Sequence, residues 1–269
     1  MATCAKESHS AVFSEGSCAG DMIDIRPRHQ FGFVMPTPLA SLFEYQFSLV
    51  FPPDCLNVGF PINLSGFSAK GVDEALERFW PAFDWLAKWG VERICLGGIP
   101  LSAYAGRPRI LALLEEAKRR TSIPASCDFE ECIEAIRHLG VRRVAVAAKW
   151  DDELMQRVLD YLAHAGIETV GFHNDPHSAE EVFALRPEES VEVALALGRG
   201  AFAKMPQADG LLLAGGAWLA LQALPMLEQE FGKAVINNPC SIYWAGLRQA
   251  GLKPSRKGFG RLLDSLHER

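Results

Sequence analysis

The sequence lacks the long apolar runs and the positive charge that mark two large classes of protein. No apolar stretch reaches the roughly 18 residues that a membrane-spanning helix needs. Its 27 Lys and Arg are outnumbered by 33 Asp and Glu, which gives a formal net charge of −6. Such a chain offers no basic surface for nucleic acid or for an anionic membrane. We therefore predict neither partner.

Cysteine pairs and a secretory signal are also missing. The seven cysteines form an odd-numbered set without a CxxC motif, and reduced thiols in a cytoplasmic protein are the expected reading. The first twenty residues, MATCAKESHSAVFSEGSCAG, contain no apolar core of the kind found in signal peptides. We predict that residues 1–28 form a flexible tail and that the protein is cytoplasmic.

No motif for a nucleotide or a metal stands out. The chain contains neither a P-loop nor a GxGxxG sequence. His173, Asp175 and His177 could contribute to a metal site, or one histidine could act as an acid–base group, whereas a solvated turn is the structural alternative. A complete metal-ligand set is not evident, so we predict no metal and no other cofactor.

Apolar runs rich in strand-forming residues alternate with amphipathic stretches, which is typical of a parallel α/β sheet. Residues 152–165 repeat apolar side chains on one helical face, and Gly166 is placed to end that helix. Pro81 is expected to kink or split another helix, 72–89. Strands are expected at 30–35, 56–62, 93–96, 143–148, 168–172, 210–214 and 234–236.

Two glycine pairs follow two of these apolar runs. Gly97-Gly98 and Gly215-Gly216 each stand between an expected strand and an apolar stretch that can form a helix. A strand that ends in Gly-Gly before a helix lets backbone N–H groups approach a ligand at the carboxyl edge of a sheet. The repetition predicts two related α/β halves that face one site. The helices expected after the pairs are residues 99–104 and 217–224.

Six sequence blocks follow one another in a characteristic order between residues 31 and 263. They are FVMP, CLGGIPLSAY, LGVRRVAVAAKW, DGLLLAGGAWLALQALP, VINNPCSIYWAGLRQAG and GFGRLLD. In these blocks the chain resembles the aspartate/glutamate racemase superfamily, within its branch of arylmalonate decarboxylases and maleate isomerases. The resemblance implies two Rossmann-like, parallel-sheet halves related by pseudo-twofold symmetry, with a ligand cleft between them. The expected division is 29–124, completed by 238–269, and 125–237.

The resemblance also shows what this chain has lost. Members of the superfamily typically use two cysteines, one from each half, and those positions match Gly98 and Gly215. The decarboxylases keep the second cysteine as a proton donor, so a cysteine restored at Gly215 is expected to supply that donor. They have hydroxyl residues where this chain has Ile99 and Pro100, and a tyrosine that matches Trp150. Two-cysteine racemisation is therefore not expected, and the ligand is expected to be larger and less polar than maleate.

Three other residues are candidates for catalysis. Cys127 and Asp128 open an expected helix, whose N-terminus would lower a thiol pKa or favour a carboxylate base. A capped helix start with acids that complement the dipole is the structural alternative. Cys240 follows a strand end close to the expected ligand, although free cysteine is usually buried and inert. The residues predicted to bind substrate are Thr37, Gly98, Ile99, Trp150, Gly215, Gly216 and Asn238.

These observations favour a cofactor-independent lyase, most like a decarboxylase. It would act on a small, partly apolar carboxylic acid, with aryl acids among the candidates, through a carbanion or enediolate. Decarboxylation needs one proton donor and survives the loss of cysteines better than racemisation does. The alternatives are an isomerase or hydrolase that uses a non-standard acid, base or thiol, and a non-catalytic carboxylate-binding homologue. The expected partner is a small carboxylate, and a homo-oligomer is compatible with the sequence.

Overall fold

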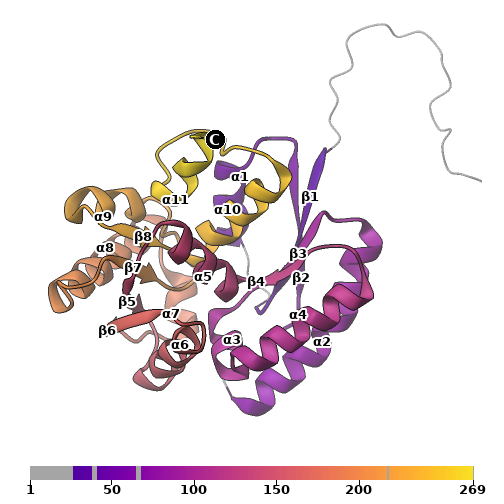
Figure 1. The fold of residues 1–269 in the computed structure, drawn as a ribbon, viewed down its shortest axis with the longest axis horizontal. Coiled ribbons are helices and arrows are strands. Elements are labelled where there is room, and N and C mark those ends of the chain that lie inside the picture. The colour runs from indigo at the N-terminus through magenta and orange to yellow at the C-terminus, as the bar shows by residue number, and fades with distance from the viewer. Residues whose placement is uncertain (1–26, 38–40, 65–67, 217, 269) are drawn as a thin grey trace, which may run out of the picture.

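A computed structural model describes residues 27–37, 41–64, 68–216 and 218–268 of the chain. Two parallel β-sheets of four strands each are flanked by helices (Figure 1). The strand orders are β2-β1-β3-β4 and β6-β5-β7-β8, so each half repeats the same order of its own strands. The predicted class, two parallel-sheet α/β halves, is confirmed. Nearly all of the predicted tail, 1–28, lies outside the described residues.

The first sheet brings three strand ends to one edge. Its strands are β1 (His29–Met35), β2 (Cys55–Pro61), β3 (Arg93–Leu96) and β4 (Ala125–Cys127). Val34 lies opposite Leu96, and Leu96 lies opposite Cys127. The residues that follow these strands, Gly97-Gly98 and Asp128 among them, therefore gather at the carboxyl edge, where open α/β sheets bind ligands.

The second sheet aligns its strand ends in the same way. Its strands are β5 (Arg143–Ala148), β6 (Glu168–Asn174), β7 (Gly210–Leu213) and β8 (Ala234–Ile236). Ala147 lies opposite Leu213, and Leu212 lies opposite Ile236. Lys149, Gly215 and Asn238 follow these strands and reach the carboxyl edge of the second sheet.

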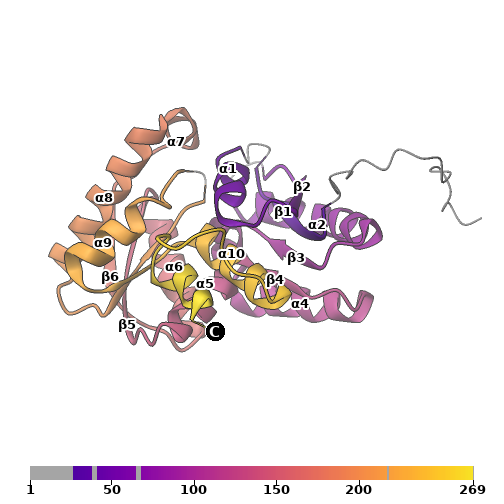
Figure 2. The ribbon, with the colours of Figure 1, turned by 90° about the horizontal axis from the view of Figure 1, so that it is seen from above.

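Helices cover the sheets and join the halves. In both views α5 and α10 lie between the sheets (Figures 1 and 2), and these two helices pack against each other. None of the helices in the described ranges is long and apolar enough to cross a bilayer. The helices are α1 (Ser41–Val50), α2 (Ala69–Trp89), α3 (Ile99–Ala105), α4 (Arg107–Arg120), α5 (Asp128–His138), α6 (Asp152–His164), α7 (Ala179–Ala184), α8 (Pro187–Lys204), α9 (Ala223–Phe231), α10 (Asn238–Ala250) and α11 (Arg261–Asp264), followed by a 3₁₀ turn, Ser265–His267.

The C-terminal segment contacts elements of both halves. Tyr243 Oη of α10 donates to the carbonyl oxygen of Phe43 at 2.7 Å, and Ser255 Oγ donates to that of Leu49 at 2.6 Å; both acceptors belong to α1. At the other end α11 packs against β8 of the second sheet. The proposed division of the chain at residues 124 and 237 stays a prediction.

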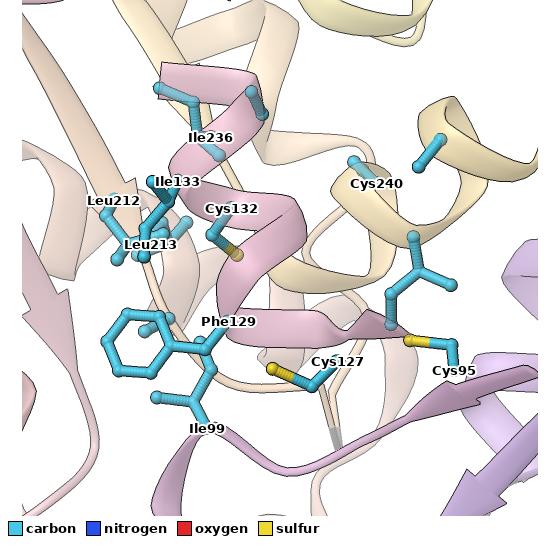
Figure 3. Packing of buried hydrophobic residues seen from close by; sticks show 14 of the residues in the cluster. Cys95, Ile99, Cys127, Phe129, Cys132, Ile133, Leu212, Leu213, Ile236 and Cys240 are labelled. Atoms are coloured by element: carbon cyan, nitrogen blue, oxygen red, sulfur yellow. The ribbon is translucent and has the colours of Figure 1, made fainter. Parts of the chain in front are cut away.

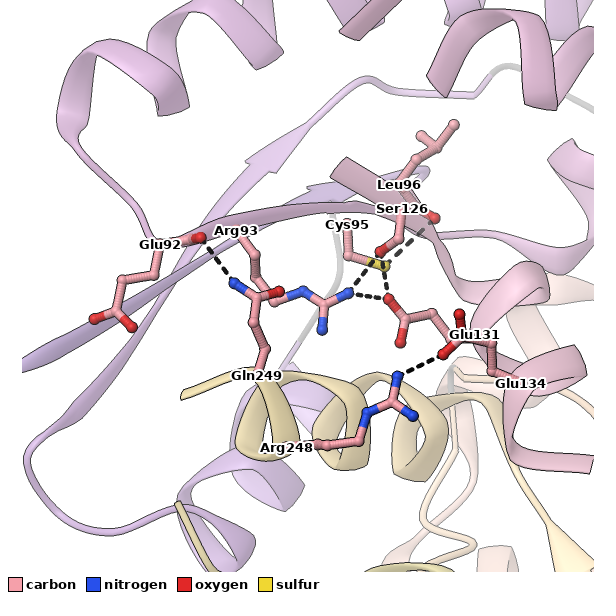
Figure 4. A network of polar contacts seen from close by, with 9 residues as sticks. All are labelled: Glu92, Arg93, Cys95, Leu96, Ser126, Glu131, Glu134, Arg248 and Gln249. Carbon is pink, nitrogen blue, oxygen red and sulfur yellow. Dashed lines mark hydrogen bonds and ion pairs between the residues drawn. The ribbon is translucent and has the colours of Figure 1, made fainter. Parts of the chain in front are cut away.

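A buried polar cluster fixes α5 beneath the first sheet (Figure 4). Arg93 of β3 bonds Glu131 of α5, and both side chains are almost fully buried. Ser126 Oγ bonds the same carboxylate and accepts from Arg93 Nη2 at 2.7 Å. Arg248 of α10 pairs with Glu134 at 2.5 Å on the solvent side of the cluster. These contacts tie the first sheet, α5 and α10 together.

One sequence expectation needs correction, and a second is only partly resolved. The expected helix at 217–224 is wrong over the described residues 218–222, where a bend and a short turn precede α9, which begins at Ala223; residue 217 lies outside the described residues. Trp218 causes part of this, since its indole N–H turns back and donates to the carbonyl oxygen of Gly215 at 2.8 Å. Of the two outcomes expected at Pro81, the split does not occur, because α2 runs unbroken around it, and the kink stays a prediction. Because Pro81 and Glu77 are exposed, the carbonyl group that loses its helical partner can bond to water.

Candidate active site

One cavity of about 350 Å³ opens between the carboxyl edges of the two sheets. Its wall is mainly apolar, and the rings of Phe33 and Phe43 stack within it with 4.2 Å between their centroids. Asp128 and Lys149 are among the few charged residues that border it. All seven residues predicted to bind substrate line this cavity: Thr37, Gly98, Ile99, Trp150, Gly215, Gly216 and Asn238. Their contact with a ligand stays a prediction.

The second glycine of the first pair and the first of the second pair adopt left-handed backbone conformations. Gly98 has a φ of +105°, and Gly215 has a φ of +123°, values that strain any residue with a Cβ. A Cβ on Gly98 would lie 3.0 Å from Pro36 Cγ, and one on Gly215 would lie 2.8 Å from Trp218 Nε1. This crowding argues against the expectation that a cysteine restored at Gly215 supplies a proton donor, and that expectation stays a prediction.

A chain of hydrogen bonds links the two turns across the cavity floor. Asp128 Oδ2 accepts from the Gly98 N–H at 2.8 Å and from Asn238 Nδ2 at 3.2 Å. Asn238 Oδ1 in turn accepts from the Gly215 N–H at 3.0 Å. The two glycine N–H groups that were expected to approach a ligand thus bond within the protein, and they orient Asp128 and Asn238.

Asp128 is a buried carboxyl group that can hold or release a proton near neutral pH. Only 1% of the residue is exposed. Burial raises the pKa of Asp128 to about 7, although the bonds from Gly98, Asn238 and the Phe129 N–H each lower it. Within the described part of the chain, its second oxygen, Oδ1, has no hydrogen-bond partner. Such a group is equipped for proton transfer.

Lys149 is the functional candidate that the sequence interpretation missed. It follows β5, it is 4% exposed, and its Nζ has no hydrogen-bond partner among the residues that the structure describes. Burial lowers the pKa of Lys149 to about 6. Its Nζ lies 3.0 Å from the centroid of the Trp218 ring. The signal was present in the sequence VAVAAKW, where one lysine ends an otherwise apolar strand.

Cys127 and Cys240 lie in the core and do not line the cavity (Figure 3). Cys127 is the N-cap residue of α5, but its Sγ lies 3.9 Å from Tyr161 Oη on the core side. Burial raises the pKa of Cys127 to about 12, so the expected lowering by the helix start is wrong in direction. Burial also raises the pKa of Cys240. Neither thiol reaches the cavity in this arrangement.

The histidine loop contributes one side chain to the cavity. His177 borders it, and its Nδ1 lies 2.7 Å from the carbonyl oxygen of Asp175. The ring of His173 instead packs against Gly200 of α8. Among the residues with described positions, no three His, Cys, Asp or Glu side chains are grouped to hold a metal ion.

Comparison with known proteins identifies the family of the chain. The sequence profile of the arylmalonate decarboxylase family matches residues 53–263. The chain belongs to the arylmalonate decarboxylase family. Arylmalonate decarboxylase of Bordetella bronchiseptica is 29% identical over 234 residues, which cover 87% of this chain and 95% of that relative. The resemblance inferred from the sequence blocks is confirmed.

Solved structures agree with this membership of the arylmalonate decarboxylase family. The structure of unliganded arylmalonate decarboxylase matches with a TM-score of 0.76 and 26% identity, over 88% of this chain and 99% of that one. Maleate cis-trans isomerase of Nocardia farcinica bound to Tris matches with a TM-score of 0.76 and 18% identity, over 90% and 100% of the two chains. At that identity the isomerase shares the fold alone.

Proposed function

We propose that this chain is a cofactor-independent enzyme that decarboxylates a small, partly apolar carboxylic acid through a carbanion or enediolate. The observation that carries the proposal is Asp128, a buried carboxyl group with a pKa near neutrality in a cavity built by both sheets. Membership of the arylmalonate decarboxylase family supports the reaction class. Acids with an aryl group suit the aromatic part of the cavity wall.

The apolar wall provides the driving force for loss of carbon dioxide. A carboxylate that leaves water for the surroundings of Phe33, Phe43 and Ile99 loses solvation, and it regains neutrality by leaving as CO₂. The cavity is large enough for a compact aryl acid, since ligand sites commonly enclose about 300–1,000 Å³. The replacement of polar family residues by Ile99 and Trp150 is consistent with this wall.

Asp128 completes the reaction by proton transfer. When the carbon–carbon bond breaks, its electron pair stays on the substrate carbon, and CO₂ departs. The proton on the Asp128 carboxyl group then moves to that carbon, and water later restores it. Oδ1 is the oxygen that would carry this proton, because Oδ2 already accepts two hydrogen bonds and Oδ1 accepts none among the described residues.

The test is product analysis with a matched pair of variants. Phenylmalonate and maleate are supplied to the purified protein in D₂O after dialysis against EDTA, and the products are identified by mass. We expect loss of CO₂ from phenylmalonate with one deuteron gained at carbon. Asp128→Asn should lower this turnover by about 10²–10⁴, whereas Asp160→Asn, which changes an exposed aspartate of α6, should retain it. Ligand binding without turnover of either acid would contradict the proposal and favour a non-catalytic homologue.

A further inference from the structure

The second half of the cavity carries a chemical group that the proposed proton transfer does not use. Lys149 ends at a buried amine without a hydrogen bond or ion pair among the described residues. An unpaired buried ammonium is costly to solvate, so the neutral amine is the form that such a place favours. A neutral lysine in an apolar pocket is a nucleophile for carbonyl carbon.

Two backbone donors that border the cavity are not available to stabilise an enediolate. The N–H groups of Gly98 and Gly215 are occupied by Asp128 and Asn238. Pro100, which follows the first turn at the second position of α3, has no N–H group. Decarboxylation requires a place for the electron pair released from the broken bond. A covalent, positively charged imine supplies such a place without any backbone donor.

We propose that Lys149 forms an imine with the ketone of a small 3-oxo carboxylic acid bound in this cavity. The inference rests on the proposed function, because decarboxylation at the same site is the reaction that the imine would serve. A 3-oxo acid carries its carboxylate two bonds from the ketone carbon, as a malonate carries it from the second carboxyl carbon. The apolar cavity wall can therefore accommodate a 3-oxo acid in the same way as a malonate.

The steps balance without a further reactant. The neutral Nζ attacks the ketone carbon, and the adduct takes up one proton and loses water to give a protonated imine. The carboxylate leaves as CO₂, and its bonding pair moves into the carbon–nitrogen system to give an enamine. Asp128 protonates the enamine carbon. Water then hydrolyses the imine, which releases the ketone and a proton and restores the amine.

Trp218 is placed to serve this chemistry. Its ring faces Nζ at 3.0 Å from the centroid, and an aromatic face stabilises a cation such as a protonated imine. The ring is held by the bond from its Nε1 to the Gly215 carbonyl oxygen. Lys149 and Trp218 border the same cavity, and rotation about the terminal bonds of the lysine is the movement that the reaction requires. Burial lowers the pKa of Lys149 to about 6, which keeps the amine neutral at physiological pH.

The decisive experiment is reductive trapping. The full-length protein is mixed with benzoylacetate, borohydride is added, and the site of the stable adduct is mapped by peptide mass. We expect one adduct per chain, on the peptide that contains Lys149. The adduct should be lost in Lys149→Met and Lys149→Arg, and it should remain in Lys88→Met, which removes an exposed lysine of α2. Mapping in the native protein gives an answer even where a variant misfolds.

Exchange of the carbonyl oxygen provides a second measurement that needs no turnover. Acetophenone, the ketone left after benzoylacetate loses CO₂, is incubated with the protein in ¹⁸O-labelled water. Imine formation and hydrolysis replace the ketone oxygen, so the native protein should accelerate labelling and Lys149→Met should not. No adduct, or an adduct spread over exposed lysines at the same level in Lys149→Met, would overturn the proposal. Phenylmalonate turnover that persists in Lys149→Met would leave the proposed function standing without the imine.

Discussion

Two buried groups on opposite sheets, Asp128 and Lys149, have pKa values displaced toward neutrality from opposite sides. Burial is the leading cause for both, because it penalises the carboxylate of one and the ammonium of the other. The pKa of Asp128 rises to about 7, and that of Lys149 falls to about 6. One apolar cavity therefore holds a protonated acid and a neutral amine at similar pH.

Asp128→Asn should separate catalysis from folding. The amide oxygen of asparagine can still accept from Gly98 and Asn238, so the turn is expected to keep its shape, but no proton can be transferred. We expect turnover to fall by about 10²–10⁴. In the native protein, turnover should decline above pH of about 7, where Asp128 loses its proton. A variant that keeps the native rate and pH profile would remove Asp128 from the mechanism.

The same substitution should alter the pH dependence of stability. The native carboxyl group keeps its proton up to about pH 7, whereas in the unfolded chain it ionises near pH 3.9. Between these values the folded state holds a proton that the unfolded state has lost, so native stability falls as pH rises. Urea unfolding from pH 4 to 7 should show this slope in the native protein and a smaller one in Asp128→Asn.

Lys149→Met should stabilise the protein. In the folded state Lys149 gives up its proton above about pH 6, but in the unfolded chain it stays protonated to about pH 10.4. Folding at neutral pH therefore releases a proton, and the cost shrinks as pH rises through that window. At pH 7 we expect the free energy of unfolding of the variant, measured with urea, to exceed that of the native protein by on the order of 2 kcal/mol. Near pH 10 the two free energies of unfolding should become equal. The control variant Lys88→Met should leave the free energy of unfolding unchanged at both pH values.

The site was predictable from the sequence where it depends on strand ends. Thr37, Trp150 and the glycine turns were found because parallel strands place their following residues at one edge. The side-chain directions were not predictable in this way. Cys127 points beneath α5 toward Tyr161, and that direction depends on the tertiary packing of the core. Lys149 was missed because a lysine after an apolar strand shows only where the side chain starts, whereas its chemistry comes from burial of the amine by the tertiary structure.

At the scale of elements, the Gly215 turn decides which side chains the cavity can hold. Gly215→Cys should destabilise the fold by about 1–3 kcal/mol through its positive φ alone. The contact with Trp218 Nε1 adds to that cost. We expect no gain of decarboxylation from the new thiol, as assayed on phenylmalonate. Gly258→Cys is the matched control, because Gly258 has a φ of +100°, close to that of Gly215, but nothing lies within 4 Å of a Cβ placed there.

The comparison of these two variants isolates the contact with the indole. Both variants place a Cβ on a residue with a similar positive φ, so backbone strain is common to both. The difference between their free energies of unfolding therefore reports the crowding at Trp218. Gly215→Cys should be the less stable of the two. Equal stability, or a thiol at position 215 that accelerates decarboxylation, would contradict the argument from backbone geometry.

Elements with strong local patterns were predicted well, and the others were not. The seven expected strands coincide with seven strands of the structure to within two residues. The eighth, Ala125–Cys127, has three residues and no apolar run, and it exists because β3 offers it a partner. The stretch 218–222 has helical composition, but its backbone follows the bonds of Trp218 to Gly215 and of Leu221 to Gln46. The first of these bonds is local and the second is long-range, and together they override the local propensity for a helix.

At the scale of the whole molecule, polar contacts couple the halves around α5 and α10. Asp128 and Asn238 begin these helices and bond each other beneath the cavity. The buried pair of Arg93 and Glu131 holds α5 to the first sheet. The residues that border the cavity and the contacts that connect the halves lie on the same two helices, α5 and α10. We therefore expect the two sheets to unfold in one cooperative transition rather than one after the other.

Glu131→Leu tests this coupling. The substitution leaves the buried Arg93 guanidinium with Ser126 as its remaining bonded partner of the cluster, and removal of one member of a buried pair costs about 3–5 kcal/mol. We expect urea unfolding to stay a single transition, with the same lowered midpoint by circular dichroism and by tryptophan fluorescence. Tryptophans of α2 report the first half, and Trp150 and Trp218 report the second.

Two further variants define the origin of that loss. Arg93→Met combined with Glu131→Leu replaces the pair by apolar side chains and should recover most of the stability, as buried pairs replaced together often do. Asp209→Asn breaks the exposed pair with Arg143 in the second half and should cost less than about 1 kcal/mol. Unfolding of Glu131→Leu in two steps, with the second half unfolding at the native midpoint, would contradict the coupling. It would show that the halves unfold independently and that the pair of Arg93 and Glu131 stabilises the first sheet alone.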